Sequence, residues 1–279
     1  MAVEFNNHAA FAYIAKENGW YEETGLGITS YESYSTGMML SSALARDDIQ
    51  VAYICLAPAL LSYAQGVPIR IVAGCHKYGF GFVVQPDIDS LQDLEGKTIG
   101  CVREGGMTDI LLNRLISNHN LADINIQRMT PQKQILALST GQLDAALLPE
   151  HQATLAESMG FNIILSSNDL WPDLQGSVLV VKSDLIEKET GTVQELVNVT
   201  QRASIWLADY PKEAADLVAK ELDTDADVVL KSMNRLEYTT DLNQTSIQEM
   251  IDYMVDLDYI DEGRIEIEHI LDLSFLERI

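Results

Sequence analysis

Two kinds of apolar pattern alternate along about the first 180 residues of the chain. Short runs of β-branched and other apolar residues are separated by longer segments in which apolar side chains recur at helical spacing. This alternation is typical of a parallel or mixed sheet with helices on both faces, so we expect a doubly wound α/β fold. The predicted strands are 28–31, 51–55, 69–73, 81–84, 98–102, 124–128, 145–148 and 177–181, and the predicted helices include 11–18, 38–45, 57–65, 109–118 and 131–139.

The pattern changes after about Ser183, where strand signals stop and amphipathic segments dominate at 193–209, 211–221 and 246–257. We therefore expect a helical C-terminal tail that returns to cover the first part of the fold. The predicted division places residues 1–82 and 182–279 in one lobe and 83–181 in a second lobe, with a ligand cleft between them.

A short sequence pattern that occurs twice supports two lobes that are built alike. In each half, a glycine-containing turn opens a helix, and a later strand ends in a proline-bearing turn. The first copy is 35–37 with 55–58, and the second is 105–108 with 148–150.

The charge balance argues against nucleic acid as a partner. The chain has 18 Lys and Arg against 42 Asp and Glu, a net charge of -24, and the acidic residues are spread along its length. A polyanion needs a basic face, which these few scattered cations do not supply. We interpret the acidic residues as a solvated surface that keeps the protein soluble, and a salt-rich environment is an alternative.

Cysteine and histidine spacing gives no catalytic, metal or cofactor motif. Cys55, Cys75 and Cys101 lack the paired spacing of a metal site, and we expect small buried side chains, with a Cys55–Cys75 bridge as the less favoured alternative. The five histidines show no metal-ligand spacing, and neither HExxH nor GxSxG occurs. We expect no catalytic residues, no metal ligands and no cofactor.

The chain shows no window of about 18 uninterrupted apolar residues, and its start lacks a basic segment followed by an apolar one. We expect a soluble chain from which any export leader is absent.

The segment 103–109 is the strongest candidate for ligand contact. It follows a predicted strand and opens a predicted helix, so unpaired backbone N–H groups and the positive end of the helix dipole would face a ligand there. Glycines let a ligand approach the backbone, and Thr108 or Asp109 would cap the helix. The candidate contacts are Gly105, Gly106, Met107 and Thr108; an ordinary strand-to-helix turn is the alternative.

Ser35, Thr36 and Gly37 have the same features at an earlier helix, where a plain capped helix is equally compatible. Asn7 and His8 follow a short β-like start, where the carboxyl edge of the sheet would lie, and ligands bind at that edge. The glycine-punctuated stretch 74–81 would suit a hinge or a flexible connector.

Five segments of the chain resemble the solute-binding proteins of the nitrate, sulfonate, taurine and thiamine-precursor importers, the NMT1/THI5-like group. The similarity runs nearly from end to end. The segments are HAAFAYIAKENGWYEETGL, GMMLSSALARDDIQVAYICLAPALLSYAQGVPIRIVAG, SLQDLEGKTIGCVREGG, ALSTGQLDAALLPEHQATLAESMG and DLDYIDEGRIEIEHILDLSFLERI.

The resemblance implies a type II periplasmic-binding fold that holds a small-molecule ligand between two lobes and delivers it to an ABC permease. It also implies a monomer in an extracytoplasmic location. Closure would occur about linkers at 80–84 and 176–181. The family pattern points to Asn7, His8, Ser35, Thr36, Gly37, Cys55, Leu56, Gly105, Gly106, Met107, Thr108, Pro149 and Glu150, with Trp171 as an aromatic wall.

Two departures from the family pattern bear on the ligand. Met107 follows the glycines where relatives carry a small polar residue, and Cys55–Leu56 replaces glycine and small residues. Both changes favour a small organic or heterocyclic ligand over an inorganic anion. An enzyme on the same fold, of the pyrimidine-precursor or menaquinone-pathway type, and a ligand-sensing domain are the alternatives.

Overall fold

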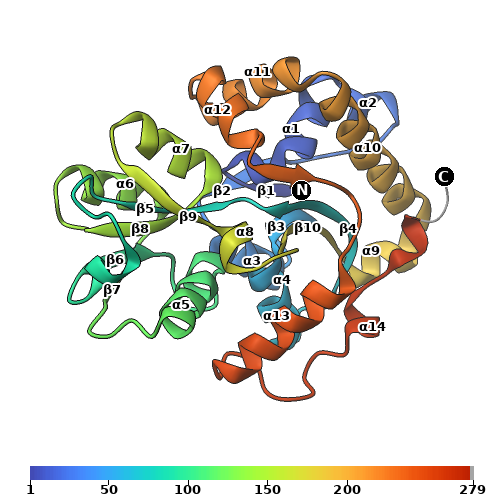
Figure 1. Cartoon of the computed structure of the whole chain (residues 1–279). Helices are drawn as coiled ribbons and strands as arrows, with labels where there is room; N and C mark the ends of the chain where they lie inside the picture. Colours follow the sequence, from blue (N-terminus) through green and yellow to red (C-terminus); the bar gives the residue numbers. More distant parts are fainter. Residues whose placement is uncertain (277–279) are drawn as a thin grey trace.

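The computed structural model describes residues 1–276, and its strands form two separate sheets (Figure 1). The larger sheet has six strands in the order β11-β4-β10-β3-β1-β2, in which β1 and β3 are parallel neighbours. Its strands are β1 (Ala2–Glu4), β2 (Glu32–Tyr34), β3 (Val51–Cys55), β4 (Ile69–Tyr78), β10 (Gln175–Lys182) and β11 (Leu236–Tyr238).

The smaller sheet has five strands in the order β7-β6-β8-β5-β9, with β6 parallel to both of its neighbours. Its strands are β5 (Phe80–Val84), β6 (Thr98–Cys101), β7 (Asn125–Arg128), β8 (Ala145–Pro149) and β9 (Asn162–Ser166). The predicted α/β fold with two mixed sheets flanked by helices is therefore confirmed.

Helices cover both faces of the six-stranded sheet (Figure 1). On one face lie α1 (Ala10–Glu17), α2 (Trp20–Glu23), α10 (Thr190–Asp209), α11 (Pro211–Leu222) and α12 (Ala226–Met233). On the other lie α3 (Gly37–Ala45), α4 (Leu56–Ala64), α13 (Gln244–Asp256) and α14 (Ile267–Ile270). The remaining elements are α5 (Met107–His119), α6 (Pro131–Ser139), α7 (Glu150–Ser158), α8 (Ser167–Leu170), α9 (Ser183–Lys188), η1 (Asn7–Ala9), η2 (Leu91–Leu94) and η3 (Leu273–Phe275).

Strand alternation explains the two layers of core. Successive side chains of a strand point to opposite faces, and both faces here are covered, so β3 and residues 178–181 of β10 are continuous apolar runs. Ile54 joins the core under α3 and α4, whereas its neighbour Tyr53 joins the core under α1 and α10. Val178 and Leu179 of β10 divide in the same way.

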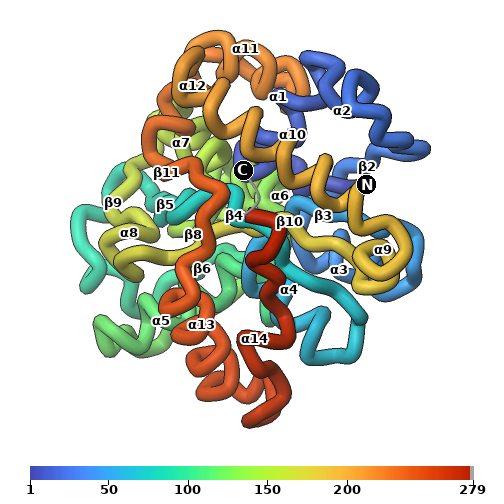
Figure 2. Tube along the Cα trace, turned by 90° about the vertical axis from the view of Figure 1, so that its right-hand side faces the viewer, coloured from blue at the N-terminus to red at the C-terminus, as the bar shows by residue number. Residues whose placement is uncertain are grey.

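The predicted helical tail is largely right, but it also contains a strand, β11, which pairs with β4 and forms one edge of the larger sheet (Figure 2). The prediction of a strand at 28–31, near the start of the chain, is wrong, because these residues form no strand. Ile28 and Tyr31 instead pack on the core beneath α1, and the strand β2 follows them. Both β2 and β11 are three-residue edge strands that are mostly exposed or half-buried, so hydrophobic patterning did not identify them.

The chain passes from the larger to the smaller sheet at Tyr78 and Gly79, and returns through residues 167–174. Both Tyr78 and Gly79 have positive φ, at 62° and 91°, so the turn between β4 and β5 is sharp. The expected linkers at 80–84 and 176–181 are buried strands, β5 and part of β10. The division into lobes at 82/83 and 181/182 stays a prediction.

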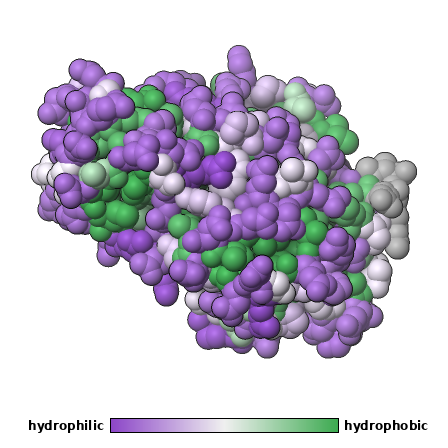
Figure 3. Space-filling model, turned by 60° about the horizontal axis from the view of Figure 1, so that its bottom comes forward, coloured by the Kyte–Doolittle hydropathy of each residue, from purple (hydrophilic) through white to green (hydrophobic). Residues whose placement is uncertain are grey.

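The three cysteines are free and buried, so the bridge between Cys55 and Cys75 is not formed. On the face that Figure 3 shows, hydrophilic side chains cover most of the surface, and apolar side chains gather in separate areas. Within residues 1–276, none of the helices has the length and apolar character that a membrane crossing requires.

We expect the substitution Gly74→Ala to lower the free energy of unfolding by about 1–3 kcal/mol. A Cβ atom at this position of β4 would overlap the carbonyl oxygen of Asp241, and the Gly74 N–H donates to the Thr240 carbonyl at 2.8 Å. Urea denaturation followed by circular dichroism measures the change.

Gly27→Ala is the matched control, because a Cβ there meets no atom within 4 Å. It should change the free energy of unfolding by less than about 0.5 kcal/mol. Equal stability of the two variants would mean that the C-terminal segment is not tightly seated on β4.

Candidate functional site

One narrow cavity lies where strand ends and helix starts of both sheets meet. The larger sheet contributes the ends of β1, β2 and β3, and the smaller sheet contributes the ends of β6, β7 and β8. Ligands of open α/β sheets bind at such carboxyl ends. The cavity measures about 20 Å³ and is lined by Glu4, Asn6, Ser35, Thr36, Gly37, Met38, Cys55, Pro58, Phe80, Val102, Gly106, Met107, Thr108, Pro131 and Pro149.

The predicted site residues divide into two groups by position. Eight of them line this cavity: Ser35, Thr36, Gly37, Cys55, Gly106, Met107, Thr108 and Pro149. The others lie outside its lining: Asn7, His8, Leu56, Gly105, Glu150 and Trp171. The part that each of the fourteen plays in ligand binding stays a prediction.

The start of α5 is held by its own side chains. Gly105 has φ of 77°, and its N–H donates to the Asp109 carboxylate at 3.1 Å. The Thr108 hydroxyl accepts from the Val102 N–H at 3.0 Å. Gly106, not Thr108 or Asp109 as expected, is the N-cap, because those two residues lie within the first turn and bind back to the preceding loop.

Asp109 also links the two halves of the fold. It accepts hydrogen bonds from the Tyr259 hydroxyl at 2.7 Å and from Arg128 at 2.8 Å. Burial raises the pKa of Asp109, and these hydrogen bonds and the Arg128 charge oppose that shift. Because Tyr259 follows α13, this contact joins the C-terminal tail to the start of α5.

The start of α3 is a capped terminus, as predicted. The Thr36 hydroxyl accepts from the Met39 N–H at 3.3 Å. Gly37 lies against the Glu4 carboxylate so closely that a Cβ would overlap the carboxylate oxygen. Glycine is required here by the approach of Glu4, not by its backbone conformation.

Glu4 is the main cavity residue that the sequence analysis missed. Its side chain is 5% exposed, and its Oε1 accepts from the Cys55 N–H at 2.7 Å. The Gly37 N–H also donates to this carboxylate. Burial raises the pKa of Glu4, and the Cys55 hydrogen bonds oppose that shift. The one available signal was an acidic residue inside the short apolar start of the chain.

His8 lies behind Cys55 rather than in the cavity lining. Its Nε2 is 2.7 Å from the Gly79 carbonyl oxygen, and its Nδ1 is 3.7 Å from the Cys55 sulfur. Burial lowers the pKa of His8 to about 4, so the ring is neutral near pH 7. Asn7 is also buried and donates to the Ser232 hydroxyl at 3.0 Å.

The Cys55–His8 pair does not form an activated nucleophile. Burial, and then the Glu4 charge, raise the pKa of the Cys55 thiol well above its usual value. A nucleophilic cysteine needs a cationic neighbour that stabilises the thiolate, whereas Cys55 has a carboxylate and a neutral imidazole. Within the described residues, no group of His, Cys, Asp and Glu is arranged to hold a metal ion.

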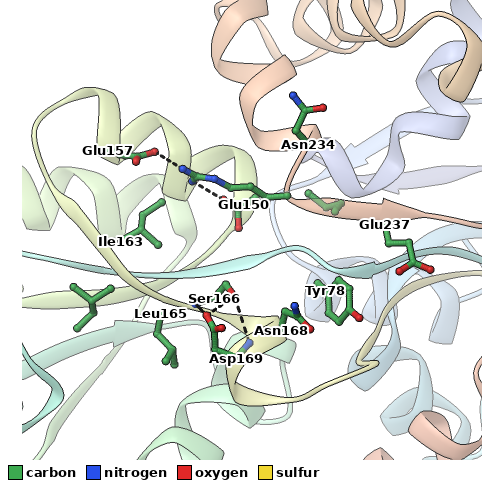
Figure 4. Close-up of a pocket in the computed structure, with 13 residues that line it drawn as sticks. Tyr78, Glu150, Glu157, Ile163, Leu165, Ser166, Asn168, Asp169, Asn234 and Glu237 are labelled. Atoms are coloured by element: carbon green, nitrogen blue, oxygen red, sulfur yellow. Dashed lines mark hydrogen bonds and ion pairs between the residues drawn. The ribbon is translucent and has the colours of Figure 1, made fainter.

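Glu150 lies in a wider surface depression of about 530 Å³ that Figure 4 shows. Arg235 donates there to Glu150 at 3.0 Å and to Glu157 at 2.8 Å. Lys231 forms a further ion pair with Glu157 at 3.0 Å. These ion pairs join α12 and the residues after it, which cover the larger sheet, to α7, which packs on the smaller one.

Trp171 is buried between α5 and α13, outside the lining of this cavity, and its role as an aromatic wall stays a prediction. The Arg114 guanidinium stacks 3.8 Å from the ring centre, and the indole N–H donates to Glu249 at 3.0 Å. Leu56, at the start of α4, is fully buried in the core.

The chain matches a known protein family and is similar to known solute-binding proteins. The NMT1-like family model matches residues 1–223. A protein of Bacillus subtilis (strain 168) named as an aliphatic sulfonates-binding protein is 24% identical over 283 residues, with 95% of this chain and 83% of that protein covered.

Solved structures with the same fold include two proteins whose names refer to transport or binding. The ligand-binding component of an ABC-type import system from Staphylococcus aureus, with zinc bound, has a TM-score of 0.87 at 18% identity, with 99% of this chain and 97% of that chain covered. The periplasmic aliphatic sulphonate binding protein SsuA from Escherichia coli has a TM-score of 0.81 at 18% identity, with 97% and 91% covered.

Buried histidines predict how stability depends on pH. Burial lowers the pKa of His151 to about 3, against an ordinary value of 6.5. The unfolded chain therefore binds the proton more readily than the folded one between these values, and the free energy of unfolding falls as the pH drops below 6.5. Between pH 7 and pH 5, His151 should lower the free energy of unfolding of the wild-type protein by about 2 kcal/mol. We expect the His151→Gln variant to lack this decrease.

Urea denaturation at both pH values measures this difference, with the exposed His119→Gln as the control. Equal pH dependence in wild type and His151→Gln would contradict a neutral, buried His151.

Proposed function

Because the chain belongs to the NMT1-like family, we propose that it is the solute-binding protein of an ABC importer and that it closes on a small organic molecule. The observation that carries this proposal is the narrow cavity between the strand ends of both sheets, at which several helices begin. The helices α3, α4, α5, α6 and α7 all begin at residues that line this cavity or directly follow lining residues. Backbone N–H groups at helix starts have no partner within their helix, so those that no other acceptor of the protein takes up are available to a ligand.

The size of the cavity supports a mechanism of closure. About 20 Å³ holds roughly one water molecule, which is too little for an organic solute. A ligand therefore enters when the two sheets move apart, and it stabilises the form in which both sheets contact it. The turn at Tyr78–Gly79 and the segment 167–174 are the two places where the backbone can bend without breaking a sheet.

We propose two lobes as the moving bodies, with the predicted boundaries shifted to the bends at Tyr78–Gly79 and 167–174 so that each sheet stays whole. The ion pairs of Arg235 and the Tyr259–Asp109 hydrogen bond are contacts that hold the lobes closed. We also propose that the protein is a monomer that lies outside the cytoplasm and delivers its ligand to a permease. The periplasmic location named for the Escherichia coli structure supports the proposed location. The protonated Cys55 thiol supports binding without turnover.

We expect the protein to release its bound ligand without any chemical change. Native mass spectrometry of the purified protein should detect one bound small molecule per chain, and denaturation should release it chemically intact. Small-angle X-ray scattering should show a smaller radius of gyration with the released molecule added back than without it. A molecule recovered in altered form would instead favour an enzyme.

Removal of the Arg235 ion pairs should favour the open form. We expect Arg235→Gln to weaken the apparent affinity for the co-purified molecule roughly threefold to tenfold, since fewer molecules are closed before binding. Isothermal titration calorimetry measures the affinity, and X-ray scattering without ligand should give a larger radius of gyration than in wild type.

Arg202→Gln is the matched control, because Arg202 pairs with Glu23 at 3.0 Å and both residues lie on the same face of the larger sheet. Its affinity and dimensions should match those of wild type. If Arg235→Gln also matches wild type, these ion pairs do not contribute to closure.

A further inference from the structure

We propose that Glu4 determines the charge of the ligand: the cavity takes an organic molecule that presents a cationic or neutral hydrogen-bond donor, such as an amine, an amidine or an aminated heterocycle, and it rejects sulfonates, carboxylates and nitrate. This inference rests on the proposed function. It separates this chain from the sulfonate-binding proteins to which it is similar.

The first argument concerns the donors at the helix starts. The N–H of Cys55, the N-cap of α4, donates to Glu4 at 2.7 Å, and the N–H of Gly37, the first residue of α3, donates to the same carboxylate. An anionic ligand would be attracted to these donors and to the positive ends of the two helix dipoles. The chain's own carboxylate already occupies that position.

The second argument concerns charge. Among the described residues that line the cavity, Glu4 is the only one with a charged side chain, and neither Lys nor Arg is present. An anion bound there would lie beside a buried carboxylate with no cation to compensate, and a low-dielectric setting increases that repulsion. A cation would form a charge-assisted hydrogen bond with the same carboxylate.

The third argument concerns the free acceptor capacity of Glu4. Among the described residues, the hydrogen-bond donors to its Oε2 are the Asn6 amide and the Cys55 thiol, each at 3.3 Å. The amide contact is long for an N–H···O hydrogen bond, and a thiol is a weak donor. This oxygen can therefore accept a further, stronger hydrogen bond from a ligand.

The opposite wall sets the shape of the rest of the ligand. The smaller sheet contributes Phe80, Val102, Met107, Pro131 and Pro149, whose side chains are apolar. A ligand with a donor group at one end and an apolar or aromatic body would satisfy both walls. Strongly hydrated inorganic ions would lose water at the apolar wall without a replacement partner.

Three probes of nearly equal shape and different charge test the proposal: benzamidine, benzamide and benzoate, with benzenesulfonate as a second anion. Isothermal titration calorimetry on the wild-type protein should give a dissociation constant for benzamidine at least tenfold lower than for either anion. Tighter binding of either anion than of benzamidine would overturn the proposal.

The variant Glu4→Gln keeps the shape of the side chain and removes its charge. The ratio of its affinities for benzamidine and benzoate should be at least tenfold smaller than in wild type, while its affinity for neutral benzamide changes less than threefold. Glu32→Gln, on the exposed strand β2, is the control and should leave all affinities as in wild type. An unchanged preference in a folded Glu4→Gln variant would overturn the proposal.

The molecule released in native mass spectrometry separates this inference from the proposed function, and it decides the case if Glu4→Gln does not fold or if the probes do not bind. A released cation or neutral donor supports both conclusions. A released sulfonate, carboxylate or inorganic anion overturns the role of Glu4 and leaves the binding function intact. Release of no molecule, together with no response to any probe, contradicts the binding function itself.

Discussion

Free backbone N–H groups at the starts of helices are the constraint on which the rest of this structure depends. Parallel strands in both sheets end at the same region, and each is followed by a helix, so the unpaired donors of several helices meet at one cavity. Buried donors need acceptors. Glu4 supplies one acceptor for α3 and α4, and Asp109 and Thr108 organise the loop before α5. The backbone N–H groups that remain without an acceptor are available to a solute.

The contacts that cross between the two sheets lie outside the lining of this cavity. Arg235 binds α7 on one side of the molecule, while Trp171 and Tyr259 join α5 to the C-terminal tail on another. Arg235 is about one third exposed, and such ion pairs contribute little stability each. A set of modest contacts of this kind is compatible with the proposed opening and closing of the two lobes.

Much of the fold could be predicted because its central strands are buried on both faces. The apolar run at β3 and the helix α4 after it were predicted almost to the residue. The exposed edge strands β2 and β11 carry no such pattern. At the site, helix starts near Gly37 and Gly106 could be predicted from glycines and capping residues. Glu4 and the Arg114–Trp171 stack could not, since each depends on partners distant in sequence.

The path of the C-terminal segment has a consequence for the order of folding. All strands of the smaller sheet lie between Phe80 and Ser166, so this sheet can form from one continuous stretch. The larger sheet takes β11 from residues 236–238, and Leu271 bridges to Ile71 across 200 positions of sequence. Long-range closures of this kind are slow. During synthesis the smaller sheet is therefore complete first, and the larger sheet keeps an unprotected edge at β4 until residues 236–271 are available to cover it.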